Sequence, residues 1–315
     1  MPLPGRNDVR WDDLKLFLAL TRAETLAGAS AQLGIHASTV FRRIGLLEEL
    51  LGTRLFDRLA TGHALTAAGS RLIEYAERIE DEALAATRAL AGGDFRLRGT
   101  VRLATTDTVA VRLLGAPLEQ FRSAHPEIIV ELLIDNRPVH LGRGEAELAV
   151  RPGPHPGQDD VIATEAARLG SGFFASKRYL QRCGKPASRR RLQCHEFVSV
   201  DSSLSSLSYA KFLTDHFPEA SIVYRSNTLL ALAAAVEAGI GIGLLPCFLF
   251  AGRQDVERLF APVPELQTPL WLLVHVDLRR TARVQALKEH LLAWTTRHSA
   301  ALLSGAAIRP DDKIS

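Results

Sequence analysis

Cysteine is scarce in this chain, which has only three cysteines among its 315 residues. Cys183, Cys194 and Cys247 are too few for a disulfide framework, and their spacing does not suit a metal site. We therefore expect free thiols in or near the core, with no bound metal and no cofactor. CxxC, HExxH and GxSxG motifs are also missing, so the sequence offers no redox, zinc-protease or serine-hydrolase signature.

Long apolar runs are missing as well. No stretch of about 18 uncharged apolar residues occurs, so we predict no membrane-spanning helix and no membrane partner. The first fifteen residues, MPLPGRNDVRWDDLK, carry acids early and lack an apolar segment, which is not the pattern of a secretory signal. The expected location is therefore the cytoplasm.

A basic excess is missing from the N-terminal part of the chain. The formal net charge is +3, yet residues 1–92 contain 11 Lys and Arg against 12 Asp and Glu. This part therefore carries a net charge of −1. If it binds DNA, it must do so through the placement of a few arginines rather than through a general positive field.

The rest of the chain is organised around residues 36–58, HASTVFRRIGLLEELLGTRLFDR. Apolar residues recur at helical spacing on one side of this stretch, while hydroxyl and basic residues fall on the other: the apolar set is Val40, Ile44, Leu47 and Leu51. We predict a helix over residues 36–51 that ends at Gly52. In most amphipathic helices with two arginines, the polar face is simply exposed to solvent. This pattern alone is therefore only weak evidence for DNA binding.

The neighbouring segments strengthen that interpretation. A helix is predicted over residues 11–22, and a shorter one, capped by Thr25, runs to residue 33 and ends at Gly34. Residues 55–65 form two short extended pieces around a Thr-Gly turn, as a wing would. Three short helices followed by a wing are the arrangement of a winged helix-turn-helix unit.

A long helix is predicted over residues 67–92, with Thr66 as its cap. One apolar seam recurs along it at alternating steps of four and three, through Leu72, Ala76, Ile79, Ala83, Ala86 and Leu90. We expect this thin seam to be buried against a second copy of the chain in a homodimer. The alternative is that it packs on the first helix of the same chain, and both can hold.

Strands alternate with helices from residue 100 to residue 297, which predicts an α/β domain with open, mostly parallel sheets. Ligands of such domains bind at the carboxyl ends of the strands. The run Gly239-Ile-Gly-Ile-Gly is not a dinucleotide fingerprint, because its spacing differs and it precedes a strand. With no catalytic motif in view, we predict that the chain is not an enzyme.

The order of these segments resembles the LysR-type transcriptional regulators. The resemblance is carried by STVFRRIGLLEELLGTRLFDR, LTAAG, TVRLATT, PLEQFRSAHPEIIVEL, GEAELAVR and AAAVEAGIGIGLLP, and it covers nearly all of residues 10–298. It implies an α/β protein with an N-terminal winged helix-turn-helix, a long linker helix and a two-lobed effector domain like that of periplasmic binding proteins. The implied partners are double-stranded DNA, a small-molecule effector and further copies of the chain in a homodimer or homotetramer. RNA polymerase is a further candidate partner.

The resemblance also implies domain boundaries. The winged helix-turn-helix would span residues 1–66 and the dimerising linker helix residues 67–92. The effector-binding domain would span residues 93–298, with lobe I at 99–167 plus 268–298 and lobe II at 168–267. Residues 299–315 are polar and contain Gly, Ala and Pro, and are expected to form a flexible tail.

Carried over to this sequence, the family's recognition helix would place Ser38, Thr39, Phe41, Arg42 and Arg43 at base edges or phosphates. Arg58, in the wing, would reach a phosphate or the minor groove. Arg42 is the principal candidate, because arginine can make a bidentate contact with guanine. Family members often have Ser-Gln where this chain has His36-Ala37, and serine where it has Phe41. The Phe41 ring would either touch a thymine methyl group or fold back onto the core.

The family's effector site would lie between the lobes, at Thr105, Thr106, Arg151, Ser202, Ser203, Asn227 and Thr228. Hydroxyl groups and helix N-termini receive anions well, and Arg151 could pair with a carboxylate, so the expected effector is a small organic acid. The alternative is a cytoplasmic small-molecule-binding protein or enzyme that uses the same α/β lobes. A catalytic pair in the cleft would favour that alternative.

Overall fold

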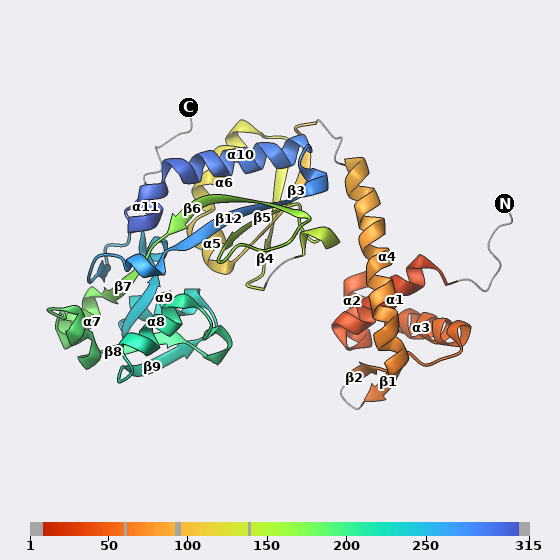
Figure 1. Ribbon diagram of the computed structural model, residues 1–315, viewed down its shortest axis with the longest axis horizontal. Coiled ribbons are helices and arrows are strands. Elements are labelled where there is room, and N and C mark those ends of the chain that lie inside the picture. Colours follow the sequence, from red (N-terminus) through yellow and green to blue (C-terminus); the bar gives the residue numbers. More distant parts are fainter. Residues whose placement is uncertain (1–8, 60–61, 92–95, 138–139, 309–315) are drawn as a thin grey trace. The chain divides into compact units, whose positions relative to one another are not determined.

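The computed structural model describes residues 9–59, 62–91, 96–137 and 140–308, and it divides into two compact units, residues 1–88 and 89–315 (Figure 1). Each unit is described by itself. Within the described residues, no helix is both long enough and apolar enough to cross a lipid bilayer.

The first unit holds three short helices, a two-stranded wing and the start of a long helix. Its elements are α1 (Trp11–Ala23), α2 (Leu26–Leu33), α3 (Ala37–Leu51), β1 (Phe56–Leu59), β2 (Gly62–Leu65) and α4 (Ala67–Ala91). The Thr25 hydroxyl accepts a hydrogen bond from the Gly28 N–H at 3.1 Å, which caps α2 as the sequence predicts. Gly52 ends α3 with a φ of 66°, a left-handed conformation that suits glycine.

The core of this unit is formed by the apolar faces of α1 and α3. Phe17 is fully buried on α1, and Val40 and Leu47 are buried on α3. The rings of Phe17 and Phe56 lie 5.4 Å apart, so the first strand of the wing closes one side of the core.

The second unit contains two five-stranded sheets, one in each lobe. The lobe I sheet has the order β4-β3-β5-β12-β6 and is made of β3 (Gly99–Thr105), β4 (Ile128–Ile134), β5 (Leu148–Pro152), β6 (Val161–Leu169) and β12 (Thr268–His275). Strands β4, β3 and β5 are parallel, whereas β12 pairs antiparallel with both β5 and β6. Three helices belong to the same lobe: α5 (Asp107–Arg112), α6 (Gly115–Ala124) and α10 (Ala282–Arg297).

The lobe II sheet has the order β11-β7-β10-β8-β9. Its strands are β7 (Ser171–Ser176), β8 (Glu196–Val200), β9 (Ser221–Ser226), β10 (Ile242–Pro246) and β11 (Val256–Arg258), and its helices are α7 (Lys177–Cys183), α8 (Ser208–His216) and α9 (Leu229–Glu237). Strands β8, β9 and β10 are parallel, and β7 runs antiparallel to β10 and β11. Both sheets are therefore mixed, whereas the sequence pattern predicts mostly parallel sheets.

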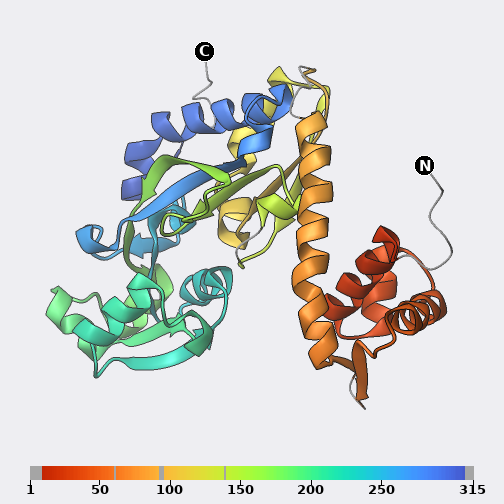
Figure 2. The same ribbon diagram turned by 45° about the vertical axis from the view of Figure 1, so that its right-hand side comes forward.

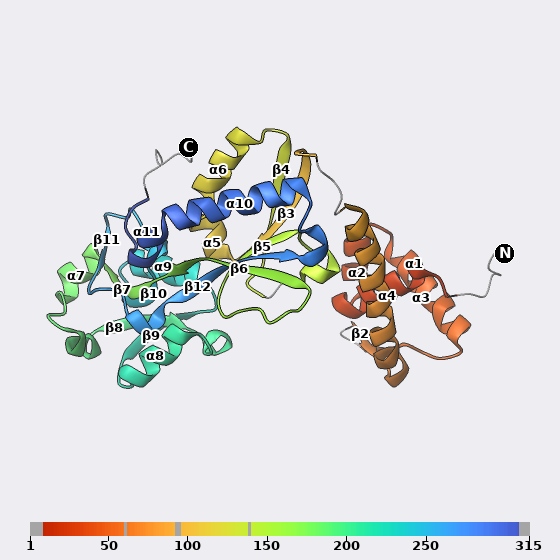
Figure 3. The same ribbon diagram turned by 45° about the horizontal axis from the view of Figure 1, so that its top comes forward.

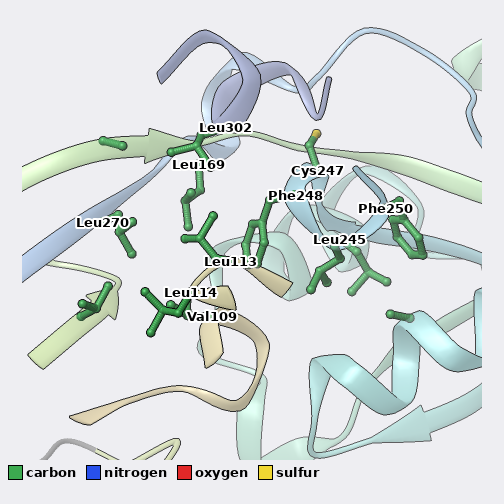
Figure 4. Close-up of a cluster of buried hydrophobic side chains, with 14 of the residues drawn as sticks. Val109, Leu113, Leu114, Leu169, Leu245, Cys247, Phe248, Phe250, Leu270 and Leu302 are labelled. Atoms are coloured by element: carbon green, nitrogen blue, oxygen red, sulfur yellow. The ribbon is translucent and has the colours of Figure 1, made fainter. Parts of the chain in front are cut away.

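Two adjacent strands carry the chain between the lobes (Figure 3). Strand β6 ends at Leu169, and after Gly170 the chain enters β7 of lobe II. The return path enters β12 at Thr268, which pairs with Leu169. One apolar cluster runs through both lobes, and Figure 4 shows the part of it that includes Leu113, Leu169 and Phe248.

The expectation of a flexible tail over residues 299–315 is wrong for its first part. Residues 299–304 form helix α11 (Ser299–Ser304), in which Leu302 is fully buried. The Leu302 carbonyl accepts a hydrogen bond from the Gly170 N–H at 3.3 Å, and a Cβ on Gly170 would lie 1.9 Å from the Leu303 carbonyl oxygen. The helix therefore packs against the crossover between the lobes. Residues 309–315 lie outside the described residues.

The expectation of thiols in or near the core holds for one cysteine only. Cys247 is buried, whereas Cys183 and Cys194 are exposed. Burial raises the pKa of the Cys247 thiol to about 11, so this thiol stays protonated and unreactive at neutral pH.

Candidate functional site

The exposed face of α3 presents the residues that the sequence singles out for DNA. Ser38 and Arg42 are exposed, and the Phe41 ring is 45% exposed rather than folded into the core. Thr39 is half-buried. A Cβ added at Gly45 would meet nothing within 4 Å. The middle of this face is therefore open and could contact another molecule. Helix α3, whose backbone can be followed in Figure 2, therefore buries Val40, Ile44 and Leu47 of the predicted stripe, while Leu51 is exposed. It leaves one basic, hydroxyl-bearing and aromatic face accessible.

Arg43 is placed differently from Arg42. Its guanidinium donates to one carboxylate oxygen of Asp13 on α1, with the Nη2 atom at 2.5 Å and the Nε atom at 3.0 Å. Both side chains are partly buried. Arg43 thus fastens α3 to α1, and its contact with DNA stays a prediction.

We expect Arg43→Ala to lower the stability of the first unit by about 1 kcal/mol, the upper range for a partly exposed ion pair. A double-mutant cycle with Asp13→Ala, read from urea unfolding, measures the pairwise energy. The coupling should weaken in high salt because the pair is only partly shielded from solvent. A coupling indistinguishable from zero in low salt would contradict the structural role assigned to Arg43.

The wing is anchored by an acidic residue that sequence reasoning did not single out. One carboxylate oxygen of Glu48 accepts the backbone N–H groups of Leu55 and Phe56, at 2.7 and 3.1 Å. Hydrogen bonds to a charged acceptor are among the stronger ones in proteins, so Glu48 fixes where the wing begins relative to α3. Arg58 lies in β1, but its side chain is outside the described residues, so its contact with DNA stays a prediction.

The seam of α4 is divided between two environments. Leu72 packs on the core of the first unit, and Ala76 is fully buried there, as the intrachain alternative expects. Farther along, Ile79 is 45% exposed and Ala86 is also exposed, while Ala83 is half-buried. The side chain of Leu90 lies outside the described residues. Within the first unit, the later part of the seam therefore keeps the Ile79 and Ala86 side chains exposed.

A cavity of about 350 Å³ lies between the two lobes of the second unit. Its walls come from the loop after β5, the crossover strands, the start of α8 and the region after β10. The described residues that line it are Thr108, Pro152, Gly153, Pro154, Leu169, Ser171, Ser206, Leu207, Ser208, Tyr209, Leu229, Pro246, Phe248, Gln267, Thr268 and Pro269. A volume of this size suits a small organic molecule.

None of the predicted effector residues is among the described residues that line this cavity, although some are next in sequence to residues that do. Thr105 is fully buried, and its hydroxyl donates to the Val150 carbonyl at 2.9 Å within the lobe I sheet. The hydroxyl oxygens of Thr106 and Thr108 lie 3.2 Å apart, and Thr108 is the one that reaches the cavity.

Arg151 makes its hydrogen bonds within its own lobe. Its guanidinium donates to the carbonyl oxygens of Asp135 and Asn136, at 2.6 and 3.0 Å. Burial lowers the pKa of Arg151, against an opposing effect of the Asp135 carboxylate. The next residue, Pro152, faces the cavity instead.

In lobe II, too, the predicted residues do not line the cavity, and residues a few positions later in the sequence do. The Ser203 hydroxyl donates to Asp201 at 2.6 Å, and Ser202 lines a separate hollow that also includes Asp201 and Arg225. Asn227 is exposed, and the Thr228 hydroxyl caps α9 by accepting the Ala231 N–H at 3.1 Å. The cavity is lined instead by residues that lie one to several positions later, such as Ser206 and Leu229.

An ion pair joins the two lobes. Arg112 on α5 of lobe I contacts Glu237 at the end of α9 of lobe II at 3.1 Å, and both side chains are partly buried. Arg253 of lobe II contacts the other carboxylate oxygen of Glu237 at 3.4 Å. Within the described residues, no cluster of His, Cys, Asp and Glu has the arrangement of a metal site.

Both units match families of known proteins. A family model described as the LysR substrate binding domain matches residues 96–296, and one described as a bacterial regulatory helix-turn-helix protein of the lysR family matches residues 11–70. The Mau operon transcriptional activator of Paracoccus denitrificans is 25% identical over 301 residues, which cover 95% of this chain and 100% of the activator. An HTH-type transcriptional regulator of Xanthomonas campestris pv. campestris is 29% identical over 60% of this chain, and the match spans 55% of that regulator.

Solved structures show the same fold. The full-length virulence activator AphB of Vibrio cholerae has a TM-score of 0.60 at 20% identity, covering 90% of this chain and 99% of that one. Full-length CbnR complexed with its target DNA has a TM-score of 0.59 at 22% identity, with the same coverage. Two family models that together match residues 11–70 and 96–296 settle the assignment: the chain belongs to the LysR family of DNA-binding transcriptional regulators.

Proposed function

We propose that this protein recognises specific operator sequences through α3 and that a small molecule bound between the lobes controls it. The observation that carries the first half is the exposed face of α3, where Arg42 is accessible while Val40 and Ile44 are buried. An arginine held on a packed helix can place a bidentate donor pair on guanine in the major groove. Ser38 at the start of the helix is suited to a phosphate.

We propose that the later part of the α4 seam joins two copies of the chain, in a homodimer or homotetramer. Leu72 and Ala76 are used within the first unit, so Ile79, Ala83 and Ala86 form the stretch that a partner helix would cover. Small residues at this spacing allow two helices to approach closely. Two half-sites in the operator would match the two-fold symmetry of such a dimer.

Ile79→Glu should dissociate this dimer, because it places a charge in the apolar stretch that the proposed interface would bury. We expect the sedimentation coefficient to fall to that of a smaller species at micromolar concentration. Glu74→Lys, a charge reversal at another exposed position of α4, is the matched control and should leave the assembly intact. An unchanged assembly in the Ile79 variant would place the interface elsewhere.

The second half of the proposal rests on the cavity between the lobes. A ligand there touches both lobes and the strands that join them, so it can favour one arrangement of the lobes over another. Control of DNA binding further requires that the ligand bind two arrangements of the oligomer with different affinity. A ligand that binds the protein without changing its DNA footprint or bend would refute this mechanism.

The expected organic acid rested on hydroxyl groups, helix N-termini and Arg151, and Arg151 donates to carbonyl groups of its own lobe and is not among the described residues that line the cavity. The cavity therefore supports a small-molecule effector, but it gives no support for a carboxylate group on that effector. The enzyme alternative needed a catalytic pair in the cleft. The described lining consists of hydroxyl, amide and apolar groups, which suit binding better than acid–base chemistry.

The most informative experiment is a genomic footprint of the full-length protein. The bound promoters give the operator, and the neighbouring genes indicate the chemistry of the effector. Gel shifts on those fragments across a salt series then measure specific binding, which should weaken steeply as phosphate counterions are released. Transcription from the same fragments with purified RNA polymerase tests polymerase as a partner. Equal affinity for operator and unrelated DNA at every salt concentration would refute sequence-specific recognition.

A further inference from the structure

We infer that the effector of this protein is an uncharged molecule with an apolar body, and that the cavity between the lobes selects against carboxylates. The inference rests on the proposed function and names the class of ligand for the same site. It starts from the chemistry of the cavity walls. Among the described lining residues, none carries a formal charge at neutral pH.

The walls divide into an apolar part and a neutral polar part. The apolar part is formed by Leu169, Leu207, Leu229 and Phe248, with four prolines: Pro152, Pro154, Pro246 and Pro269. The polar part consists of hydroxyl groups and one amide, on Thr108, Ser171, Ser206, Ser208, Tyr209, Thr268 and Gln267. Such walls can hydrogen-bond a carbonyl, amide or hydroxyl group, but they offer no counterion to a carboxylate. A buried ion without a partner is strongly disfavoured.

Two arginines from the segments that line the cavity already have partners. Arg151 donates to two backbone carbonyl groups, of Asp135 and Asn136, and Arg112 contacts Glu237 at 3.1 Å. Neither arginine is among the lining residues. To reach an anionic ligand, either guanidinium would have to give up these partners and change its conformation.

A negative charge acts on the polar wall. Burial raises the pKa of the Tyr209 phenol far above neutrality, and the Asp107 carboxylate raises it further. Tyr209 lines the cavity and is therefore a neutral hydroxyl donor close to a carboxylate. A second anion at this place would meet repulsion from Asp107, whereas an uncharged acceptor would not.

Three helices begin near the cavity, and two of their N-termini are already occupied. Asp107 accepts the Thr108 N–H at 2.6 Å at the start of α5, and Thr228 caps α9. Helix α8 begins at Ser208 without a side-chain cap, and Ser208 and Tyr209 both line the cavity. The N–H groups of this first turn suit the partial negative charge of a carbonyl oxygen. They would favour one orientation of an amide or ester without supplying a full counter-charge.

Matched pairs of probes test the inference with the full-length protein. Benzamide and benzoate, and indole-3-acetamide and indole-3-acetate, are pairs of nearly the same shape in which a neutral amide group replaces a carboxylate that is charged at pH 7.5. Binding is measured by calorimetry and by ligand-observed NMR. We expect each amide to bind at least about tenfold more tightly than its carboxylate, because the carboxylate must lose its hydration without gaining a cation.

Two exposed lining residues provide the variants. Ser206→Trp should fill the cavity and abolish binding of the amides, which shows that the probes occupy this site. Gln267→Arg adds a cation at the wall and should shift the preference towards the carboxylates by about tenfold or more, since a charge-assisted pair replaces an unpaired anion. Gln267→Leu, which adds no charge, is its control and should keep the preference for amides.

A pH series gives an independent readout. If only the neutral form of a carboxylic acid enters the cavity, lowering the pH from 7.5 to 5.5 should raise the apparent affinity for benzoate about tenfold for each pH unit. The affinity for benzamide should stay constant. Tighter binding of the carboxylates at pH 7.5, lost in Ser206→Trp, would overturn the inference and leave the proposed function standing. Failure of every probe to bind would overturn both the inference and the effector part of the proposed function, while DNA recognition is tested separately through Arg42.

Discussion

Arg42→Ala should lower the affinity for the specific operator about tenfold to hundredfold and leave binding to unrelated DNA nearly unchanged. The expected loss corresponds to the roughly 1–3 kcal/mol of discrimination that one bidentate arginine–guanine contact provides. Arg42 is exposed on α3, and the described residues show no hydrogen bond or ion pair that it would lose within the chain. Gel shifts with operator and scrambled fragments measure the ratio. The melting temperature should stay that of the unsubstituted protein.

The neighbouring arginine is the matched control. Arg43→Ala removes the same charge one position away, but it should act mainly through stability, because Arg43 is bound to Asp13. Arg58→Ala should weaken binding to all sequences alike and reduce the salt dependence, as loss of a phosphate contact does. Equal losses for Arg42→Ala and Arg58→Ala on every sequence would contradict this division of roles.

Leu302→Ala should destabilise the effector domain by about 2–5 kcal/mol, the usual cost of truncating a fully buried leucine. For a domain of this size, such a loss lowers the melting temperature by on the order of 10 °C. Leu302 is 0% exposed, and its helix packs on the crossover at Gly170. Differential scanning calorimetry of the full-length protein measures the change.

Ala300→Ser, at an exposed position of the same helix, controls for the effect of changing α11 itself and should shift the melting temperature very little. Deletion of residues 299–315 should destabilise the protein at least as much as Leu302→Ala. If the deletion left the melting transition unchanged, these residues would be a loose tail after all.

The first unit was predictable because its signals are local. Thr25 and Gly52 mark helix ends through short-range backbone geometry, and the stripe from Val40 to Leu47 defines a buried face within one helix. The role of Glu48 was not visible in this way. It depends on the path of the chain after α3, which brings the N–H groups of Leu55 and Phe56 to its carboxylate.

The cavity was only partly predictable, because its walls come from segments far apart in the sequence. The family resemblance indicated the correct ends of strands and helices, but the side-chain direction alternates along a strand. Thr105 therefore points into the lobe I sheet, and Arg151 turns to the carbonyl of Asp135, whereas Pro152 faces the cavity. Helix α11 is not predicted by the average Gly, Ala and Pro content of residues 299–315, because that average hides the short apolar segment at its start. The Leu302–Leu303 pair was the available signal.

The placement of β12 also has a consequence for synthesis of the protein. This strand lies between β5 and β6 in the lobe I sheet, yet its residues follow all of lobe II in the chain. On the ribosome, β5 and β6 therefore emerge long before the strand that joins them. The strands of lobe II, from Ser171 to Arg258, form one continuous stretch and can pair first. Lobe II is thus expected to mature before the lobe that precedes it, and a chain arrested before Thr268 should expose the edges of β5 and β6 to chaperones or aggregation.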